Sequence, residues 1–234
     1  MHVGLLSDIH GNRVALDAVL EDMPPVDTLV CAGDVVGYNP WPGACVDALR
    51  TGEALRAVTG LDDPDPAVVP TVMGNHDRAV VEDAPFRFNR MARAGVNHAT
   101  TALDHAQLEW LAGLPTERTA VDGRVRIVHG HPDDPDRYTP PEEFSPSLLA
   151  DEDVLVMGHT HVQHAERYDE RLVVNPGSVG QPRDGDPRAA YAVVDMETMT
   201  VALRRVEYDV EAVQHAVSDA DLPEETASRL AVGR

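Results

Sequence analysis

His2-Val3-Gly4-Leu5-Leu6-Ser7-Asp8-Ile9-His10, near the start of the chain, is an apolar run that leads directly into an acid and a histidine. The apolar run predicts a strand over His2–Leu6. Asp8 and His10 then fall in the loop that follows this strand. Such a pair at a strand end is a candidate for metal or acid–base chemistry, although one pair by itself is weak support.

A helix and a second strand are expected after this loop. The apolar residues of the helix recur at helical spacing, at Leu16, Val19, Leu20 and Met23. Pro24-Pro25 ends the helix, because proline lacks a backbone donor. A strand over Thr28–Ala32 then leads into Gly33-Asp34. Strand, helix and strand in this order are typical of the first unit of an α/β domain.

The pattern of an apolar run followed by metal-binding or acid–base residues occurs six times. The six motifs are Asp8-Ile9-His10, Gly33-Asp34, Gly74-Asn75-His76-Asp77, His129-Gly130-His131, Gly158-His159-Thr160-His161 and Asn175-Pro176-Gly177-Ser178. Together they predict one site that converges at one edge of a sheet. Their carboxylate, carboxamide and imidazole groups, without thiolates, suit divalent Mn, Fe, Co, Ni or Zn.

The remaining apolar runs predict further strands and helices. The expected strands are Pro70–Met73, Arg124–Val128, Val154–Met157, Leu172–Val174, Tyr191–Val194 and Val201–Val206. One helix is expected near residues 98–112, and another starts at Asp209 as N-cap with Val210, Val213 and Val217 facing inward. The close spacing of the C-terminal strands predicts a second, more antiparallel sheet.

Two stretches rich in Asp and Pro predict loops, at residues 60–70 and 132–146. The second loop follows His129 closely, so it is expected either to border the site as a lid or to be a plain solvated loop. The chain has neither internal repeats nor an interdomain linker. We therefore expect a single domain over residues 1–234, with a core at 1–208 and a C-terminal helical tail at 209–234.

Composition sets limits on the partners of this chain. The 234 residues are 43% hydrophobic, which is enough for one core, and the formal net charge is −21. All 19 basic residues are arginine, because the sequence contains no lysine. This surface repels phosphate backbones, so non-specific nucleic-acid binding is not expected. The composition resembles that of proteins from salt-loving organisms, and biased genomic composition is the alternative explanation.

The cysteines and the N-terminus predict a cytoplasmic location. Cys31 and Cys45 are the only cysteines, too few for a disulfide framework. A cleaved signal is not expected, because a functional motif already occurs at Asp8. No apolar run approaches the length of a membrane span.

The residue types of the six motifs predict a site for two metal ions. Asp34 is the natural bridging ligand, since a carboxylate can give one oxygen to each ion. Asp8 and His10 lie two residues apart, so in an extended segment both would point to one side. His159 and His161 share this spacing, Asn75 offers a neutral oxygen, and His129 is preferred over His131 because it lies nearer the strand end. Two ions held in this way can position a bridging hydroxide and align a phosphate ester.

These motifs resemble those of the calcineurin-like metallophosphoesterase superfamily, whose pattern is D-x-H, G-D, G-N-H-D/E, H and G-H-x-H. Every motif occurs here in that order over residues 8–161. Residues 175–180, Asn-Pro-Gly-Ser-Val-Gly, are similar to the small bacterial and archaeal phosphodiesterase branch. The resemblance implies a four-layer α/β/β/α sandwich of two mixed sheets, with the metals at the C-terminal edge of the strands.

The resemblance also implies a role for each motif residue. Asp8, His10 and His161 would bind the first metal, Asp34 would bridge, and Asn75, His129 and His159 would bind the second. His76 would act as general acid or lie against the phosphate. Manganese is the preferred metal, with Fe, Co, Ni or Zn as alternatives.

The implied activity is hydrolysis of phosphate esters, most simply of small-molecule phosphodiesters. Val35-Val36-Gly37-Tyr38 follows Gly33-Asp34 where the related protein phosphatases have an Asp-Arg-Gly sequence, so the arginine that would hold a phosphoprotein is missing. The partner that would orient His76 is missing as well. The alternatives are a phosphomonoesterase, a dinucleotide polyphosphate hydrolase and an inactive metal-binding scaffold.

Two further residues are candidates for substrate contacts. Arg183 could neutralise a substrate phosphate, and a surface ion pair is the alternative for it. Asn12 could line the pocket, and turn formation explains it equally well.

The net charge predicts that the fold depends on salt. Added KCl screens repulsion between surface carboxylates, so the melting temperature should rise steeply from dilute buffer to molar KCl. Thermal unfolding followed by circular dichroism at a series of salt concentrations measures this. A flat profile would leave compositional bias as the explanation for the missing lysines.

Overall fold

β1 (His2–Leu6) lies inside the first of two sheets in this computed structural model, which describes residues 1–61, 68–83 and 88–234. β2 (Thr28–Cys31) runs parallel to β1 on one side, and β8 (Ala189–Asp195) runs antiparallel on the other. β9 (Thr200–Val206) extends the sheet beyond β8. The predicted strand–helix–strand unit at the N-terminus is confirmed.

The second sheet has five strands in the order β3-β4-β5-β7-β6. Their bounds are β3 Glu117–Ala120, β4 Val125–Val128, β5 Val154–Val156, β6 His164–Tyr168 and β7 Arg171–Asn175. The three inner strands are parallel, and an antiparallel strand pairs with them at each edge. Both sheets are therefore mixed, as the family resemblance implied.

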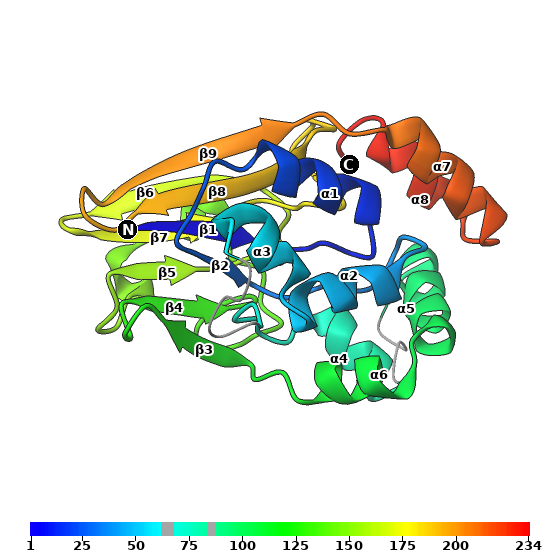
Figure 1. Ribbon diagram of the computed structural model, residues 1–234, viewed down its shortest axis with the longest axis horizontal. Coiled ribbons are helices and arrows are strands. Elements are labelled where there is room, and N and C mark those ends of the chain that lie inside the picture. Colours follow the sequence, from blue (N-terminus) through cyan, green and yellow to red (C-terminus); the bar gives the residue numbers. More distant parts are fainter. Residues whose placement is uncertain (62–67, 84–87) are drawn as a thin grey trace.

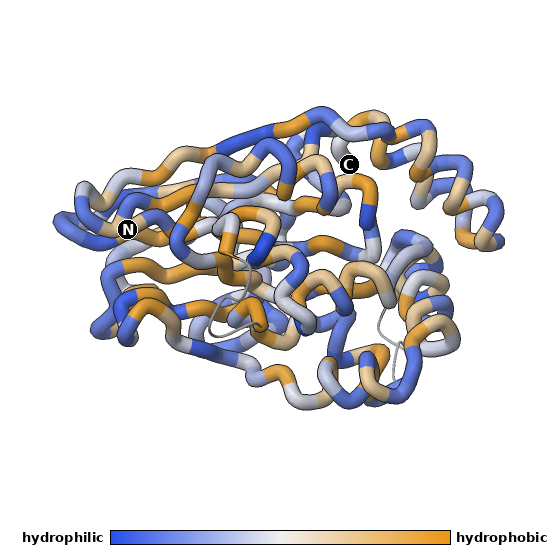
Figure 2. The backbone as a smooth tube through the Cα atoms, viewed as in Figure 1, coloured by the Kyte–Doolittle hydropathy of each residue, from blue (hydrophilic) through white to orange (hydrophobic). Residues whose placement is uncertain are grey.

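The two sheets pack face to face through the alternating side chains of their strands. Val3 and Leu5 of β1 join Ile127 of β4 and Val156 of β5 in one fully buried cluster. Leu6, on the other face of β1, belongs instead to the cluster beneath the helices. Hydrophobic residues follow these inner strands in Figure 2, whereas exposed loops are hydrophilic.

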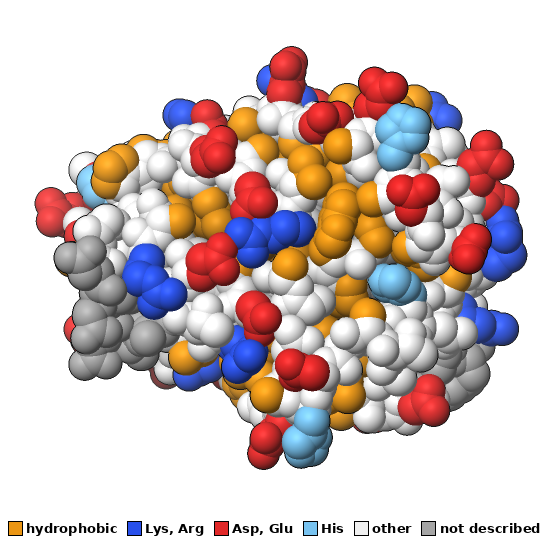
Figure 3. Space-filling view, turned by 45° about the vertical axis from the view of Figure 1, so that its right-hand side comes forward, with side chains coloured by type: hydrophobic (Ala, Val, Ile, Leu, Met, Phe, Trp, Pro, Cys, Tyr) orange, Lys and Arg blue, Asp and Glu red, His pale blue; other side chains and the backbone are white. Residues whose placement is uncertain are grey.

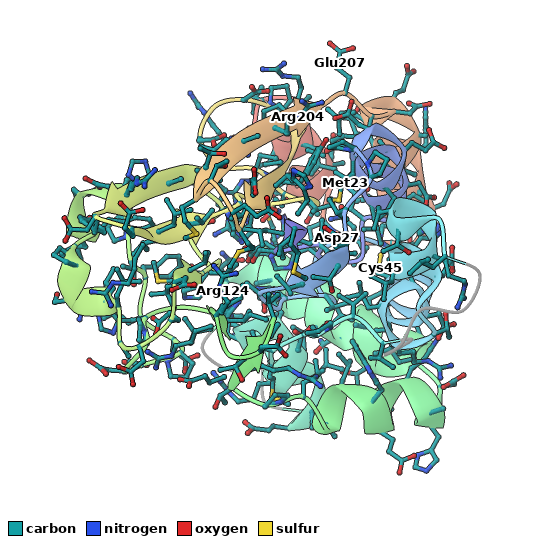
Figure 4. All side chains as sticks on the ribbon, turned by 60° about the vertical axis from the view of Figure 1, so that its left-hand side comes forward. Met23, Asp27, Cys45, Arg124, Arg204 and Glu207 are labelled. Atoms are coloured by element: carbon teal, nitrogen blue, oxygen red, sulfur yellow. The ribbon has the colours of Figure 1, made fainter. Side chains whose placement is uncertain are left out.

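Six helices contribute to the apolar cluster on the outer face of the first sheet. They are α1 Arg13–Asp22, α2 Pro42–Arg50, α3 Glu53–Thr59, α4 Asn75–Val81, α5 Arg90–Ala102 and α6 His105–Ala112. Cys45 of α2 is buried there, as a small apolar residue would be (Figure 4). Figure 1 shows most of these helices gathered at the right of the strands.

The outer face of the second sheet carries a thinner layer. Two 3₁₀ helices, Pro141–Glu143 and Pro146–Leu148, lie in the loop after β4. Phe144 and Leu148 pack there against side chains of β4, β5 and β7. The four-layer sandwich is thus confirmed, with 3₁₀ helices as its fourth layer.

The chain ends in two helices, α7 (Val210–Asp219) and α8 (Glu224–Leu230). Asp209 caps α7 as predicted, because its side chain accepts a hydrogen bond from the Ala212 N–H at 2.9 Å. The buried residues of both helices form a separate cluster with Trp41 packed against it. Figure 1 shows the pair at one end of the molecule, beside α1.

Three sequence-based expectations for the elements were wrong. β8 and β9 belong to the first sheet, because β8 pairs with β1 along its length. The helix expected near 98–112 is two helices, since Leu103 is extended and Asp104 caps a new helix. Pro70–Met73 forms only a single bridge, from Thr71 to Cys31, rather than a strand.

The sequence also left several elements unpredicted. α2, α3, β3 and β6 were missed, since short amphipathic or exposed segments have weak periodicity. Most of the loop expected at residues 60–70 lies outside the described residues. Among the described residues, none of the helices has the length and apolar composition that crossing a bilayer requires.

Candidate metal centre

The polar motifs meet where the parallel segments of both sheets end. β1, β2 and the bridge at Thr71 are parallel in the first sheet, and β4, β5 and β7 are parallel in the second. Hydrogen bonds join the two sets of ends. His129 donates from Nδ1 to the Ala32 carbonyl at 2.8 Å, and the His159 N–H donates to Asp8 Oδ2 at 3.0 Å. The predicted convergence at one edge is therefore what the structure shows.

A first group of buried ligand atoms comes from four residues. Asp8, His10, Asp34 and His161 each offer one atom, and these atoms lie within 4.8 Å of one another. His161 Nε2 is 3.2 Å from Asp8 Oδ1 and 3.1 Å from His10 Nε2. His10 Nε2 is 3.6 Å from Asp34 Oδ2. The four side chains are at most 2% exposed, so they form an interior cluster.

A second group shares Asp34 with the first. Asp34, His129 and His159 also offer ligand atoms within 4.8 Å of one another. His129 Nε2 is 3.4 Å from Asp34 Oδ2 and 3.1 Å from Asn75 Oδ1. Six of the seven residues that the sequence singled out as ligands therefore lie in two adjoining groups with Asp34 in common, and the seventh, Asn75, contacts His129 of the second group.

The groups around each ligand fit a divalent metal. His10, His129 and His161 each place Nδ1 against a main-chain carbonyl, at 3.1, 2.8 and 2.6 Å. Donation from Nδ1 turns Nε2 toward the cluster, where the neutral form of each imidazole carries its lone pair; metal-binding histidines are usually oriented in this way. Asp8 Oδ1 is buried and accepts no hydrogen bond from the described residues. A cation is the partner that this oxygen and these nitrogens lack.

The ligand positions have an unusual backbone. Asp8, His10 and Asp34 have φ of 53°, 51° and 53°, and His159 and His161 have φ of 68° and 60°. The left-handed region is uncommon for residues other than glycine and costs roughly 1–2 kcal/mol per residue. The expectation that Asp8 and His10 point to one side of an extended segment was therefore wrong. Tight turns direct both side chains into the cluster.

Two glycines keep space for the buried carboxylates. A Cβ on Gly74 would lie 2.1 Å from Asp34 Oδ1, and a Cβ on Gly158 would lie 1.9 Å from Ser7 Oγ and 2.8 Å from Asp8 Oδ2. Contacts this short are not found in proteins, so any larger residue must displace the carboxylates. The glycines in the Gly-Asn-His-Asp and Gly-His-Thr-His motifs are thus explained by packing.

Charges in the cluster offset the cost of burying it. Burial favours a raised pKa for Asp8, but His161 and His129 together outweigh it and lower that pKa; for Asp34, His129, His76 and His10 do the same. Burial favours a lowered pKa for His129, but Asp34 raises it to about 10. Burial and then the His129 charge lower the pKa of His159 to about 4. Before a metal binds, His129 is thus the main cation of the cluster, and a metal must displace its proton.

His76 lies beside the cluster, outside both ligand groups. Its main-chain N–H donates to Asp34 Oδ1 at 2.8 Å, and its ring stacks on Phe88 at 4.5 Å between centroids. Nδ1 is buried without a partner among the described residues, and a Cβ on Gly37 would lie 2.4 Å from it. Packing, rather than an acid, therefore orients the ring. Burial lowers the pKa of His76 to about 4, so the ring is neutral at pH 7.

Asp77 is a structural residue of the site that sequence reasoning missed. Its carboxylate accepts hydrogen bonds from the Gly74 N–H at 3.0 Å and the Val36 N–H at 3.1 Å. These bonds join the loop that carries Asp34 to the loop that carries Asn75. The position of Asp77 three residues after a helix N-cap was the available signal, since an acid there binds the cap backbone.

A cavity of about 240 Å³ opens onto the cluster. Its lining residues are Asp34, Tyr38, Asn75, His76, Phe88, Asn89, Ala92, Tyr138, His159, His161, Arg183 and Arg229. Tyr138, in the predicted 132–146 loop, stacks on His159 with ring centroids 4.0 Å apart. His159 Nε2 also donates to the Asp136 carbonyl at 3.1 Å. That loop therefore borders the site.

The other candidates have separate environments. Arg183 lines the cavity, and its Nη2 donates to the Tyr38 hydroxyl at 3.1 Å. Asn12 is buried as the cap of α1, with its amide donating to the Gly180 carbonyl at 3.1 Å, so a substrate contact for Asn12 is not supported. His131 accepts from the Asp133 N–H and is not part of either ligand group.

The fold and this cluster define a metal-dependent hydrolase with its site between two sheets. The family model of the calcineurin-like phosphoesterase superfamily domain matches residues 1–199. The chain belongs to this superfamily, and it is a metal-dependent phosphoesterase.

Similar proteins span nearly all of the chain. An uncharacterized protein of Methanocaldococcus jannaschii, MJ0912, is 28% identical over 99% of this chain and 98% of its own length. Phosphodiesterase YfcE of Escherichia coli is 29% identical over 86% of this chain and 91% of its own. A metallophosphoesterase from Sphaerobacter thermophilus, known from its crystal structure, has a sequence 34% identical to this chain. The two structures align with a TM-score of 0.79 over 100% of this chain and 99% of the other.

The space beside Gly74 provides a test of the cluster. Gly74→Ala should displace Asp34 and lower metal content by about one ion or more per chain if Asp34 holds both ions. Metal analysis after loading with Mn, with circular dichroism as a check on folding, measures this. Gly113→Ala is the matched control, because the nearest atoms to its Cβ lie at 3.5 Å. Full metal content in a folded Gly74→Ala protein would contradict the displacement.

Proposed function

We propose that this protein hydrolyses small phosphodiesters with two divalent metal ions. The observation that supports this most directly is the carboxylate of Asp34, which is common to both groups of ligand atoms. His10 of the first group and His129 of the second lie 3.6 and 3.4 Å from the same oxygen, Asp34 Oδ2, while Oδ1 accepts the His76 N–H. This anionic carboxylate would serve as a ligand to both ions. Asp8, His10 and His161 would complete the first site, and Asn75, His129 and His159 the second.

The metals and the protein would divide the chemistry. Two ions, when bound, supply Lewis-acid activation of water and of the phosphoryl oxygens. The carbonyl partners of His10, His129 and His161 hold the imidazoles in the tautomer that ligates. Tyr138 and Phe88 line the cavity and stack on His159 and His76, which holds these two imidazole rings in place. Manganese remains our preferred metal, and the cytoplasm our expected location.

His76 is proposed as a neutral hydrogen-bond donor to the phosphoryl group. Of the two roles implied by the resemblance, general acid and phosphate contact, the low pKa favours the second. Only a small fraction of a group with a pKa near 4 is protonated at pH 7, so it is a poor general acid there. Nearby metal ions would lower that pKa further. A neutral imidazole still has one N–H with which to stabilise charge on a phosphoryl oxygen.

A small diester is favoured as substrate by three features. The cavity of about 240 Å³ suits a compact ester. Gly33-Asp34 lacks the following arginine of protein phosphatases. The similar protein YfcE carries the name phosphodiesterase.

Substrate preference is tested by comparing the kcat/KM for a small diester with that for a phosphopeptide. The metal-loaded protein should hydrolyse bis(p-nitrophenyl) phosphate with a kcat/KM about tenfold or more above that for a phosphoserine peptide, the effect of one missing charge-assisted contact. Steady-state kinetics at high salt measure both values. Faster turnover of the peptide would replace this proposal with a phosphomonoesterase, and no turnover of any ester would favour the scaffold.

The bridging role of Asp34 predicts a change in metal stoichiometry. Wild-type protein should bind about two Mn ions per chain, and Asp34→Asn should lose at least one, because an amide lacks the negative charge that a ligand shared by two cations supplies. Metal titration followed by elemental analysis measures the stoichiometry. Asp133→Asn, at a side chain that is 93% exposed, is the charge-matched control. An undiminished second ion in Asp34→Asn would rule out the bridge.

The role of His76 predicts equal losses on different leaving groups. His76→Ala should lower kcat about 10²-fold or more, because an oxyanion donor is lost, on nitrophenyl and alkyl esters alike. Since the neutral form acts, this contribution should stay constant from pH 6 to pH 8. His215→Ala, at a surface histidine of α7, is the control. A much greater loss on the alkyl ester would instead indicate proton transfer, and loss of metal would make His76 a ligand.

A further inference from the structure

Two arginines line the cavity from distant parts of the chain. Arg183 lies in the loop after β7, and Arg229 lies in α8, near the end of the chain. Both are half-buried. They are near enough that the charge of Arg183, after burial, helps to lower the pKa of Arg229. Two guanidinium groups therefore share one small cavity with the metal cluster.

Neither cation is neutralised by an acidic side chain of the described residues. The ion pairs of the described part of the chain include arginines elsewhere, such as Arg13 with Asp17 and Arg126 with Glu117, but neither Arg183 nor Arg229. This is notable in a chain with 40 acidic and 19 basic residues. Figure 3 shows acidic side chains spread over one face of the molecule. Two cations that line one small cavity make its potential more positive, which favours an anion there.

The two arginines are held by structure, so the cavity is prepared for an anion. Arg183 donates from Nη2 to Tyr38 and to Gln181 Oε1 at 2.8 Å, while its buried Nε has no partner among the described residues. Arg229 donates from Nε to the Arg234 main-chain oxygen at 2.7 Å. The Gly185 N–H donates to the Gly233 carbonyl at 2.9 Å, which fastens the end of the chain to the Arg183 loop. One anchored unit thus presents both charges.

We propose that Arg183 and Arg229 form an anion subsite that selects phosphate esters carrying a second phosphate group. This inference rests on the proposed function: the metal cluster would bind the phosphate that reacts, and the arginines would bind the other. Arg229 lies beyond residue 199, where the match to the family model ends. The C-terminal helices would therefore add substrate selectivity to the shared catalytic core.

Calorimetry on the metal-loaded protein tests the subsite without turnover. The probes are two matched pairs, ADP with AMP, and thymidine 3′,5′-bisphosphate with thymidine 5′-monophosphate. In at least one pair, wild-type protein should bind the compound with two phosphate groups (ADP or thymidine 3′,5′-bisphosphate) about tenfold or more tightly than the compound with one. This is the gain expected for charge-assisted hydrogen bonds from arginine. Arg229→Gln should remove most of this preference, and Arg229→Lys should keep part of it. No preference in either pair, or one that survives Arg229→Gln, would overturn the proposal.

Controls separate this proposal from the proposed function. Arg124→Gln removes the same charge at the residue before β4, which does not line the cavity, and should leave the preference unchanged. If Arg229→Gln unfolds α8, Arg183→Gln provides the same test from the other side of the cavity. Failure to hydrolyse any ester would refute the proposed function, whereas the calorimetric preference would still decide on the subsite.

Discussion

The burial of two carboxylates is the constraint on which this structure depends. Asp8 and Asp34 are 0% and 1% exposed, and isolated charges in such a setting are very costly. The fold surrounds them with four imidazoles and with main-chain N–H groups from both sheets. Because His129, His159 and His161 come from loops of the second sheet, the two sheets must close on each other before the carboxylates have all their partners. The site and the tertiary structure are therefore formed by the same contacts.

The sequence predicted the site better than it predicted the elements around it. The ends of parallel strands meet at one edge of a sheet. Metal-binding residue types at six strand ends therefore predict that these residues lie close together, and this needs no knowledge of side-chain angles. The structure places six of the seven expected ligands in the two groups and brings Asn75 against His129. The geometric reason offered for Asp8 and His10 was nevertheless wrong, because both lie in left-handed turns. Backbone conformation at a strained position depends on neighbours such as Gly158 and Ser178, which no local pattern contains.

Other residues depended on pairing and packing that periodicity does not encode. β8 and β9 follow β7 closely in sequence, yet β8 pairs with β1, about 190 residues earlier, and β9 pairs with β8. Asn12 has a polar side chain of the kind that lines pockets. Its amide instead accepts a hydrogen bond from the Ala15 N–H and donates one to the Gly180 carbonyl. No sequence pattern predicts a functional role for Arg229, because nothing near it resembles a motif. Only the packing of α8 beside the cavity brings it into view.

The strained turns and the buried charges point to a common physical logic. Five ligand residues have a positive φ, which is unfavourable for residues other than glycine. Burial of the carboxylates and the histidines away from water is likewise unfavourable. Strain of this kind persists only where surrounding structure over-determines it. Here the surroundings are the packed faces of two sheets, main-chain hydrogen bonds accepted by Asp77, and glycines that leave space. A preorganised cluster loses little entropy when a metal binds, so on the proposed two-metal interpretation part of the folding free energy is invested in metal affinity.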